Sequence, residues 1–161
     1  MRALSVITSD CFAMASRDVP SRVRRTEVGE AERGTAMTRK ILVIDDEPEF
    51  CRVLARVLTE MGHQVSTASG GRQGLARIRK NPPDLVFLDI KMPRMSGLEC
   101  LRRIRKFKRK FVIVVMTGFG DIQSAREALR LGAEEYISKP FDLDDLKQLV
   151  NELVKDLAGG A

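Results

Sequence analysis

The chain has 161 residues, of which 43% are hydrophobic and 31% are charged, and its formal net charge is +6 at pH 7. The length fits one domain, since single domains most often run to about 100–150 residues, and the composition is typical of a globular protein. No apolar run approaches the roughly 20 residues that span a bilayer, which argues against a membrane role. The basic residues are scattered and only Arg102 to Lys110 forms a dense run, so we expect no direct contact with nucleic acid.

The thiols and the single imidazole exclude several kinds of site. Cys11, Cys51 and Cys100 are odd in number and lack metal-ligand spacing, which predicts free thiols in a reducing compartment, the cytoplasm. His63 is the one histidine, so a His-based catalytic site is hard to build. It follows Gly62 at the end of a predicted helix, which predicts a surface position.

The pattern along the chain divides it into three parts. Residues 1–37 show no sustained helical or strand period, and we expect a disordered extension or an over-extended reading frame with the true start at Met37. Residues 38–157 are predicted to form the folded domain. Residues 158–161 are expected to fray at the C-terminus.

The folded part begins with two pairs of a strand and a helix. Residues 40–44 form a buried type of strand, and from Phe50 the apolar positions recur at helical spacing until Gly62. Residues 64–68 form a shorter and weaker strand. The second helix ends before Pro82, because a proline disfavours the helical conformation in the residue that precedes it.

The third strand runs directly into a carboxylate. Residues 85–88 are apolar without alternation, which suits a strand covered on both faces, and Asp89 follows at its end. Pro93 and Gly97 stop the strand from continuing. Ser96 is placed to cap a third helix.

The last part of the chain repeats this pattern. Residues 111–116 form the most strand-like run and deliver Thr117 at their end. Asp121 can cap a fourth helix, a short strand is predicted around 136–137, and an amphipathic helix begins at Asp142. Five strands alternating with five helices predict an α/β fold: a five-stranded parallel sheet with helices on both faces, in a flavodoxin-like doubly wound (βα)5 arrangement.

Polar residues follow four of these strands. Because the carboxyl ends of parallel strands share one edge of the sheet, we expect these side chains to converge. Clustered carboxylates repel one another unless a cation lies among them, and hard oxygen ligands favour Mg²⁺. A carboxylate beside a divalent cation, an ammonium and a hydroxyl is suited to receive a phosphoryl group, with Asp89 as the nucleophile. The converging residues are Asp45, Asp46, Asp89, Thr117 and Lys139.

Each residue also has a simpler interpretation when it is taken alone. Asp89 could begin a turn, and Asp45 and Asp46 could open a helix, where acids favour the macrodipole. Thr117 could be a hydroxyl at a strand end, and Lys139 could lie on the surface. The joint presence of all five favours the phosphoryl site.

The chain from about Arg39 to Leu157 resembles a response-regulator receiver domain of two-component signalling. No single motif is specific, but their order and separation are. The motifs are Asp45-Asp46-Glu47-Pro48, Asp89-Ile90-Lys91-Met92-Pro93 with Ser96-Gly97, Thr117-Gly118, Gly132-Ala133 and Lys139-Pro140-Phe141.

This resemblance implies a role for each site residue. Asp89 accepts a phosphoryl group from a histidine kinase or a histidine phosphotransfer protein, as in a phosphorelay, and forms an aspartyl phosphate. Asp46, Asp89 and the backbone carbonyl of Lys91 bind Mg²⁺, and Asp45 helps through water. Thr117 and Lys139 contact the phosphoryl oxygens. Such domains are not enzymes beyond catalysing their own phosphorylation and dephosphorylation.

The resemblance also implies a switch and a partner. Movement of Thr117 toward the phosphate makes room for Tyr136 to turn inward, which reshapes the nearby surface. Lys91 and Phe119 are expected to tune how fast water enters. The family often has a cis bond before Pro140. We expect a single-domain, cytoplasmic response regulator that signals to an unknown downstream protein, with a phosphorylation-dependent homodimer left open.

Three other functions are weighed against this one. A haloacid-dehalogenase type of phosphatase has a second acid two residues after its nucleophile, where this chain has Lys91. A flavodoxin-like electron carrier has a first loop rich in Ser, Thr and Gly, whereas acids stand here and would repel a flavin phosphate. A receiver-shaped interaction module that is never phosphorylated remains an alternative, although the complete acidic site disfavours it.

Overall fold

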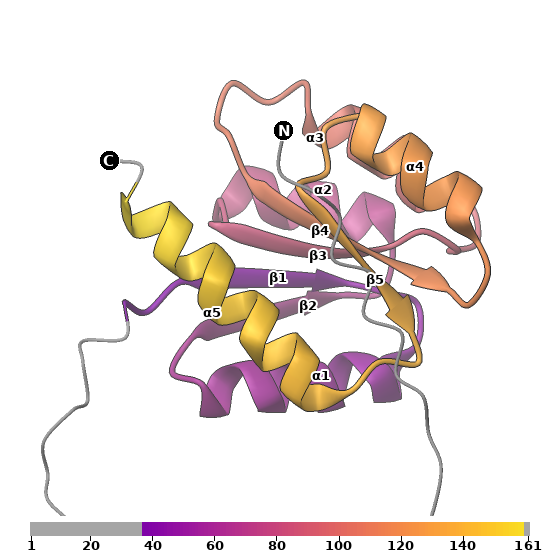
Figure 1. Cartoon of the computed structure of the whole chain (residues 1–161). Helices are drawn as coiled ribbons and strands as arrows, with labels where there is room; N and C mark the ends of the chain where they lie inside the picture. The colour runs from indigo at the N-terminus through magenta and orange to yellow at the C-terminus, as the bar shows by residue number, and fades with distance from the viewer. Residues whose placement is uncertain (1–36, 160–161) are drawn as a thin grey trace, which may run out of the picture. The chain divides into compact units, whose positions relative to one another are not determined.

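The computed structural model describes residues 37–159, which form a five-stranded sheet in the order β2-β1-β3-β4-β5. Every neighbouring pair of strands is parallel (Figure 1). The predictions for residues 1–36 and 160–161 lie outside the described residues. The strands are β1 (Lys40–Ile44), β2 (Gln64–Ala68), β3 (Leu85–Asp89), β4 (Val112–Gly118) and β5 (Glu135–Lys139).

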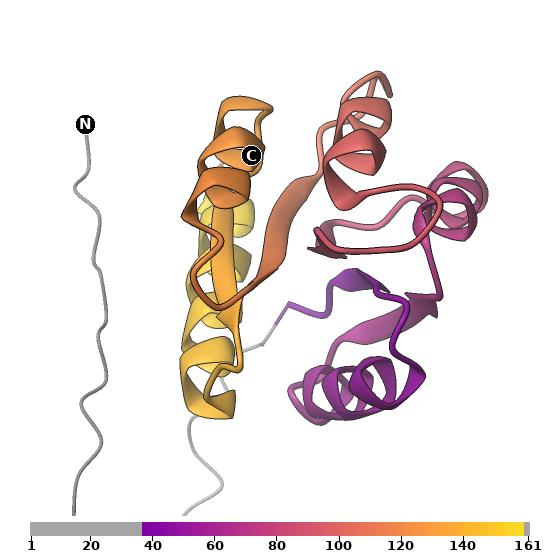
Figure 2. The same ribbon diagram turned by 90° about the vertical axis from the view of Figure 1, so that its right-hand side faces the viewer.

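Within the described residues, four helices connect the strands, a fifth follows β5, and together they cover both faces of the sheet. Viewed toward the carboxyl ends of the strands, α1 and α5 lie on one side and α2, α3 and α4 lie on the other (Figure 2). This arrangement confirms the predicted doubly wound fold. The helices are α1 (Pro48–Glu60), α2 (Gly71–Lys80), α3 (Gly97–Ile104), α4 (Ile122–Arg130) and α5 (Leu143–Gly159).

The central strand β3 explains why its sequence shows no polar alternation. Successive side chains of a strand point to opposite faces, and here both faces are covered by helices. Phe87 packs in the cluster beneath α1 and α5, whereas Val86 and Leu88 pack in the cluster beneath α2, α3 and α4. All three are fully buried, so β3 is anchored on both sides and holds its last residue, Asp89, in a fixed place.

The predicted helix caps are present. The Ser96 hydroxyl accepts a hydrogen bond from the amide of Glu99 at 3.2 Å, and the Asp121 carboxylate accepts one from the amide of Ser124, also at 3.2 Å. Several strand boundaries differ from the prediction, and β5 covers Glu135–Lys139 rather than only the residues around 136–137. β4 extends through Thr117 and Gly118, because Gly118 is paired with Lys139 of β5.

The surface position predicted for His63 is wrong. The side chain is buried, and its Nδ1 lies 3.4 Å from the backbone amide of Arg39, which donates to it. Burial, together with the charge of Arg39, lowers the pKa of His63. The glycine before it ends α1 and turns the chain into β2, and this turn directs the imidazole inward.

Arg105, in the middle of the dense basic run, is not a simple surface charge. Only 25% of its side chain is exposed, and it donates hydrogen bonds to the carbonyls of Phe111 and Gly132. It forms an ion pair with Glu134 at 2.9 Å, and Glu134 in turn accepts the amide of Ile113 at 2.6 Å. The end of α3 is thereby tied to β4 and to the turn before β5.

Candidate acidic site at the carboxyl edge of the sheet

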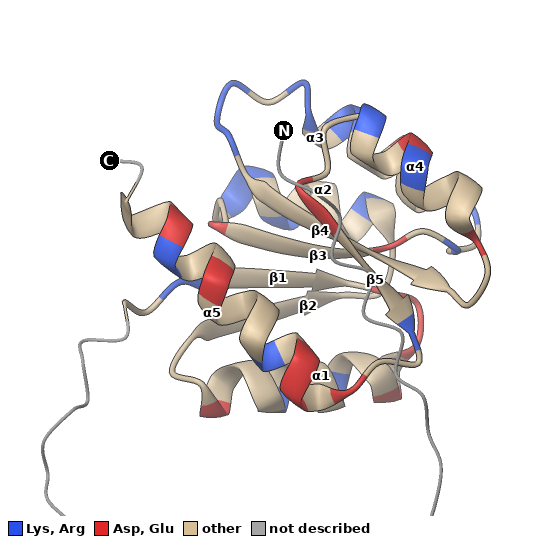
Figure 3. Ribbon diagram, viewed as in Figure 1, with Lys and Arg blue, Asp and Glu red and all other residues tan. Residues whose placement is uncertain are grey.

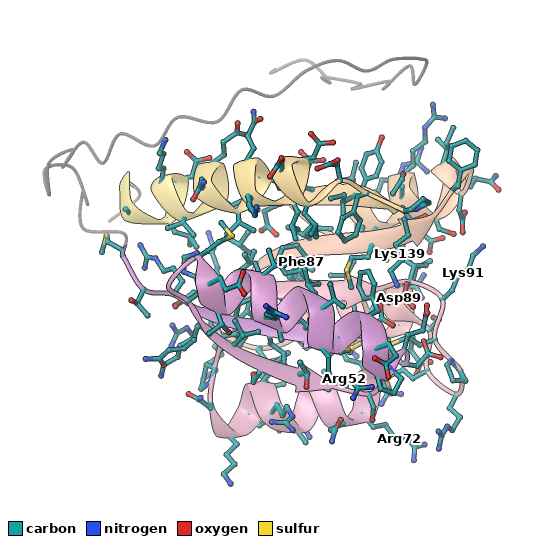
Figure 4. All side chains as sticks on the ribbon, turned by 90° about the horizontal axis from the view of Figure 1, so that it is seen from below. Arg52, Arg72, Phe87, Asp89, Lys91 and Lys139 are labelled. Carbon is teal, nitrogen blue, oxygen red and sulfur yellow. The ribbon has the colours of Figure 1, made fainter. Side chains whose placement is uncertain are left out.

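Four of the five converging residues meet at the carboxyl edge of the sheet. Asp45 and Asp46 follow β1, while Asp89 and Lys139 are the last residues of β3 and β5. Carboxylate oxygens of the three acids lie within 4.8 Å of one another. Figure 4 shows Asp89 and Lys139 close together at this edge, with Lys91 on the loop outside them.

The ammonium of Lys139 lies among the acids. Its Nζ is 2.5 Å from Oδ2 of Asp45, 3.6 Å from Oδ1 of Asp89 and 3.9 Å from Oε1 of Glu47. The same Nζ stands 4.1 Å from the centre of the Phe50 ring, which can stabilise a cation through its π face. Lys139 is therefore held closest to Asp45 and within reach of Asp89.

Asp45 has both of its carboxylate oxygens occupied. Its side chain is fully buried, Oδ1 accepts the amide of Glu47 at 2.9 Å, and Oδ2 accepts Lys139. Among residues 37–159, no hydrogen bond engages the carboxylate of Asp46, which is only partly buried. The two acids next to each other in sequence thus differ in their freedom to bind a further ligand.

The site carries excess negative charge in a buried place. Burial raises the pKa of Asp89 to about 6, the charge of Lys139 lowers it, and the charges of Asp45 and Asp46 raise it further. Burial lowers the pKa of Lys139, but its hydrogen bond to Asp45 and the charges of Asp89 and Asp45 outweigh this and leave it raised. Three acids face one ammonium, so negative charge remains that a divalent cation could neutralise. The ligands are carboxylate oxygens, which suit Mg²⁺.

A glycine after β3 fixes the position of Asp89. A Cβ on Gly97 would lie 2.1 Å from the carbonyl oxygen of Asp89 and 2.6 Å from Cα of Ile90. The Gly97 amide also donates to the carbonyl of Ile90 at 2.8 Å. The sequence predicted Gly97 only as a strand breaker, whereas the structure shows that its missing side chain lets α3 start against the strand end.

Thr117, the fifth converging residue, is buried on β4. Its register partner on β5 is Ser138, and the residue before it, Met116, pairs with Asp89. The Thr117 hydroxyl donates to the carbonyl of Gly118 at 3.1 Å and lies 3.5 Å from that of Asp121. It is therefore near the acids along the sheet edge, but its hydroxyl bonds to the loop between β4 and α4.

The three residues predicted to tune or switch the site lie around it. The ammonium of Lys91 is 3.5 Å from a carboxylate oxygen of Asp121, and 69% of the Lys91 side chain is exposed. Phe119 is 90% exposed. Tyr136 is partly buried and packs against the core cluster beneath α2, α3 and α4.

Two neighbours of the acids were not predicted as site residues. Phe50 was assigned to the apolar stripe of α1, yet its ring also supports Lys139 and meets Phe141 edge to face, with centroids 5.7 Å apart. The thiol of Cys51 donates to the backbone carbonyl of Asp45 at 3.5 Å, and burial raises its pKa to about 11. Helical spacing indicates that these residues face inward but cannot show which charged group they meet.

Comparison with known proteins identifies this arrangement. The response regulator receiver domain family matches residues 41–151. The chain belongs to this family. The receiver domain is 35% identical to the sporulation initiation phosphotransferase F of Bacillus subtilis over 116 residues, which are 72% of this chain and 94% of that protein.

Solved structures agree in fold. A response regulator receiver domain protein from Clostridium thermocellum is 35% identical with a TM-score of 0.70, covering 76% of this chain and 98% of that one. The receiver domain of NtrX from Brucella abortus is 37% identical with a TM-score of 0.68, covering 71% and 98% respectively.

Other relatives are longer. The regulatory protein AtoC of Escherichia coli is 36% identical over 121 residues, which are 75% of this chain but 26% of that protein. Receiver domains are in general signalling modules rather than enzymes, they typically bind Mg²⁺ at an acidic pocket, and their partner is a histidine kinase or a phosphotransfer protein. No helix within the described residues is long and apolar enough to cross a membrane.

The crowded acids should cost folding stability. Without Mg²⁺ at pH 8, we expect Asp89→Asn to raise the free energy of unfolding by about 1–3 kcal/mol, because each unit of raised pKa corresponds to about 1.4 kcal/mol. The folded wild type takes up a proton on Asp89 near pH 6, before the unfolded chain does. This protonation stabilises the folded wild type as the pH falls below 6. The difference in free energy of unfolding between Asp89→Asn and the wild type should therefore shrink. Urea unfolding at pH 8 and pH 5 measures both values.

The matched control is Asp156→Asn, which removes an exposed acid of α5. Its effect should stay within about 0.5 kcal/mol at either pH. A stability for Asp89→Asn at pH 8 that equals or falls below that of the wild type would contradict the repulsion argument.

Proposed function

We propose that this receiver domain accepts a phosphoryl group on Asp89 from a histidine kinase or a histidine phosphotransfer protein. The observation that carries the proposal is the position of the Asp89 carboxylate, 3.6 Å from the ammonium of Lys139 and clustered with two further acids. A carboxylate can attack a phosphoryl group and form an acyl phosphate. Little else is needed from the protein than positioning and neutralisation of the transferred charge.

The acids supply the metal site in this proposal. Asp46, Asp89 and the backbone carbonyl of Lys91 would hold Mg²⁺, with Asp45 contributing through water. Two observations support this division: both oxygens of Asp45 are already engaged, and the Asp46 carboxylate is not. When it is bound, Mg²⁺ supplies positive charge to the phosphoryl oxygens. Asp46 and Asp89 then act as anchors that keep the acceptor oxygen beside that charge.

Lys139 supplies the second positive charge. In the structure it is 1.1 Å closer to Asp45 than to Asp89, from 2.5 Å against 3.6 Å. A phosphoryl group on Asp89 adds anionic oxygens on that side, so Lys139 is expected to turn from Asp45 toward Asp89. The ring of Phe50, which packs against Phe141, lies beside Lys139 and can stay in contact with the ammonium as it turns.

Thr117 and Tyr136 would convert phosphorylation into a change of shape. The Thr117 hydroxyl bonds weakly to the loop after β4 and can exchange these contacts for a phosphoryl oxygen. Tyr136 is only partly buried, so movement of Thr117 can draw it inward and alter the surface of α4, β5 and α5. Lys91 and Phe119 at the rim would set how readily water reaches the acyl phosphate.

The remaining features follow from this role. The only catalysis we propose is that of the domain's own phosphorylation and dephosphorylation, and the complete acid cluster disfavours an interaction module that is never phosphorylated. The chain spans 94% of the length of the sporulation initiation phosphotransferase F but 26% of that of AtoC, and we propose that the phosphorylated receiver domain signals to a downstream protein. Location in the cytoplasm is supported by the buried free thiols of Cys51 and Cys100.

Chemical phosphorylation tests the acceptor directly. Incubation with acetyl phosphate and Mg²⁺ should add one phosphoryl group to the wild type by intact-mass spectrometry, because acetyl phosphate is a small acyl phosphate donor. Asp89→Asn should lose this gain completely, and removal of Mg²⁺ with EDTA should lower the yield at least about tenfold.

Asp84→Asn provides the control, since Asp84 directly precedes the opposite end of the strand that ends in Asp89. It should be phosphorylated like the wild type. Persistence of the mass gain in Asp89→Asn would reject Asp89 as the acceptor.

The proposed switch can be followed by intrinsic fluorescence. Tyr136 is the only tyrosine and the chain has no tryptophan, so tyrosine emission reports on this one side chain. Beryllofluoride, which stands in for the phosphoryl group, should change the emission when added with Mg²⁺. Thr117→Ala should abolish the change, because Tyr136 follows Thr117 in this account, whereas Thr59→Ala on α1 should retain it. A full response in Thr117→Ala would show that the two residues are not coupled.

A further inference from the structure

A groove of about 490 Å³ lies between α2 and α3. None of its lining residues belongs to the acid cluster. On α2 the lining residues are three and four positions apart, so they share one face of that helix. The other lining residues come from the last turn of α3 and from the turn that follows it. The lining residues are Arg72, Leu75, Arg79, Arg103, Lys106 and Phe107.

The lining of this groove is strongly positive. Lys and Arg are concentrated on α2, α3 and the loop that follows α3 (Figure 3). Four of the six lining residues are cations and none is an acid. Within residues 37–159, Arg72, Arg79 and Lys106 have no acidic partner, whereas Arg103 is paired with Glu99 at 2.6 Å.

Two neighbouring basic residues outside the groove are paired with acids. Arg102 pairs with Glu127 at 2.5 Å, and Arg109 pairs with Asp84 at 3.2 Å. Lys80, Lys108 and Lys110 also have no acidic partner within residues 37–159, so unpaired positive charge extends beyond the groove. The concave shape of the lining and its aromatic ring are what favour a compact anion over a long polyanion.

The floor of the groove is apolar and aromatic. Leu75 is buried and Phe107 is partly buried. Phe107 meets the buried Phe111 edge to face, with centroids 6.1 Å apart, which fixes its ring. The guanidinium of Arg79 lies 5.7 Å from the centre of the Phe107 ring, so two planar groups already stand near each other at this end of the groove.

We propose that this groove binds a phosphorylated small molecule that carries a planar ring, of the nucleotide class. Arg72, Arg103 and Lys106 would hold the phosphate groups through charge-assisted hydrogen bonds. The ring would stack against Phe107 and Arg79. The volume lies within the range of about 300–1,000 Å³ that is usual for small-molecule sites.

Isothermal titration calorimetry of the full chain tests the proposal, with adenosine triphosphate and inorganic diphosphate as separate probes. The buffer contains EDTA, so that metal at the acid cluster cannot recruit the phosphates. The double variant Arg72→Gln with Arg79→Gln should weaken nucleotide binding by about tenfold or more, since each charge-assisted contact is worth about 1.5–3 kcal/mol. Asp89→Asn should bind like the wild type, which separates this site from the phosphoacceptor.

The matched control is the double variant Arg102→Gln with Arg109→Gln, which removes the same charge outside the groove. It should change affinity by less than about twofold, because exposed paired charges contribute little. Phe107→Leu should weaken nucleotide binding by about fivefold or more and leave diphosphate binding unchanged, since stacking is worth about 1–3 kcal/mol per base. Phe107→Tyr, which keeps the ring, should restore it.

Four results with the nucleotide and diphosphate probes would overturn the proposal. They are no binding of the nucleotide at millimolar concentration, equal losses in the two double variants, equal weakening of both probes by Phe107→Leu, and failure of Phe107→Tyr to restore nucleotide binding. An oligonucleotide that binds more tightly than the nucleotide and is indifferent to Phe107 would also overturn it and would assign the basic surface to nucleic acid. Circular dichroism of each variant separates lost binding from lost folding.

Discussion

The ammonium of Lys139 among three carboxylates is the interaction on which the rest of this structure depends. Burial at the sheet edge weakens the screening of each charge, so the acids repel strongly and the single cation is held tightly. Burial and the excess of acids over cations leave the pKa of Asp89 raised, and a further cation could compensate the remaining negative charge. On this account the acid cluster alone lowers the free energy of unfolding, and a bound cation offsets that loss.

The fold supplies the rigidity that such a site requires. β3 is buried on both faces, so the strand holds Asp89 in place although the neighbouring acids repel its carboxylate. Gly97 lets α3 begin directly against the end of that strand. Burial of the two apolar clusters stabilises the fold and so offsets the electrostatic repulsion among the acids at the edge of the sheet.

Much of this could be predicted from the sequence, because apolar runs and helical spacing report directly on burial. The run before Asp89 indicated a strand covered on both faces, and the polar residues after several strands indicated one shared edge. The choice of partner for each side chain could not be predicted in this way. The engagement of both oxygens of Asp45, the ring of Phe50 beneath Lys139 and the burial of His63 all depend on contacts between distant segments.

The orientation of Thr117 and the distribution of charge on α3 show the same limit. Spacing placed Thr117 at the edge, but the hydrogen bonds to the loop carbonyls follow from the turn after β4. The basic residues around Arg105 appeared equivalent in sequence. In the structure Arg105 joins α3 to the turn before β5, while Arg103 and Lys106 line a groove with α2.

A crystal structure with Mg²⁺ and beryllofluoride would test the central claim most directly. The account predicts a beryllium–oxygen bond at the carboxylate of Asp89, with Mg²⁺ on Asp46 and Asp89. It also predicts that the ammonium of Lys139 lies closer to the fluorides than to Asp45. Beryllofluoride on another side chain, or Lys139 still bound to Asp45 and out of reach of the fluorides, would contradict it.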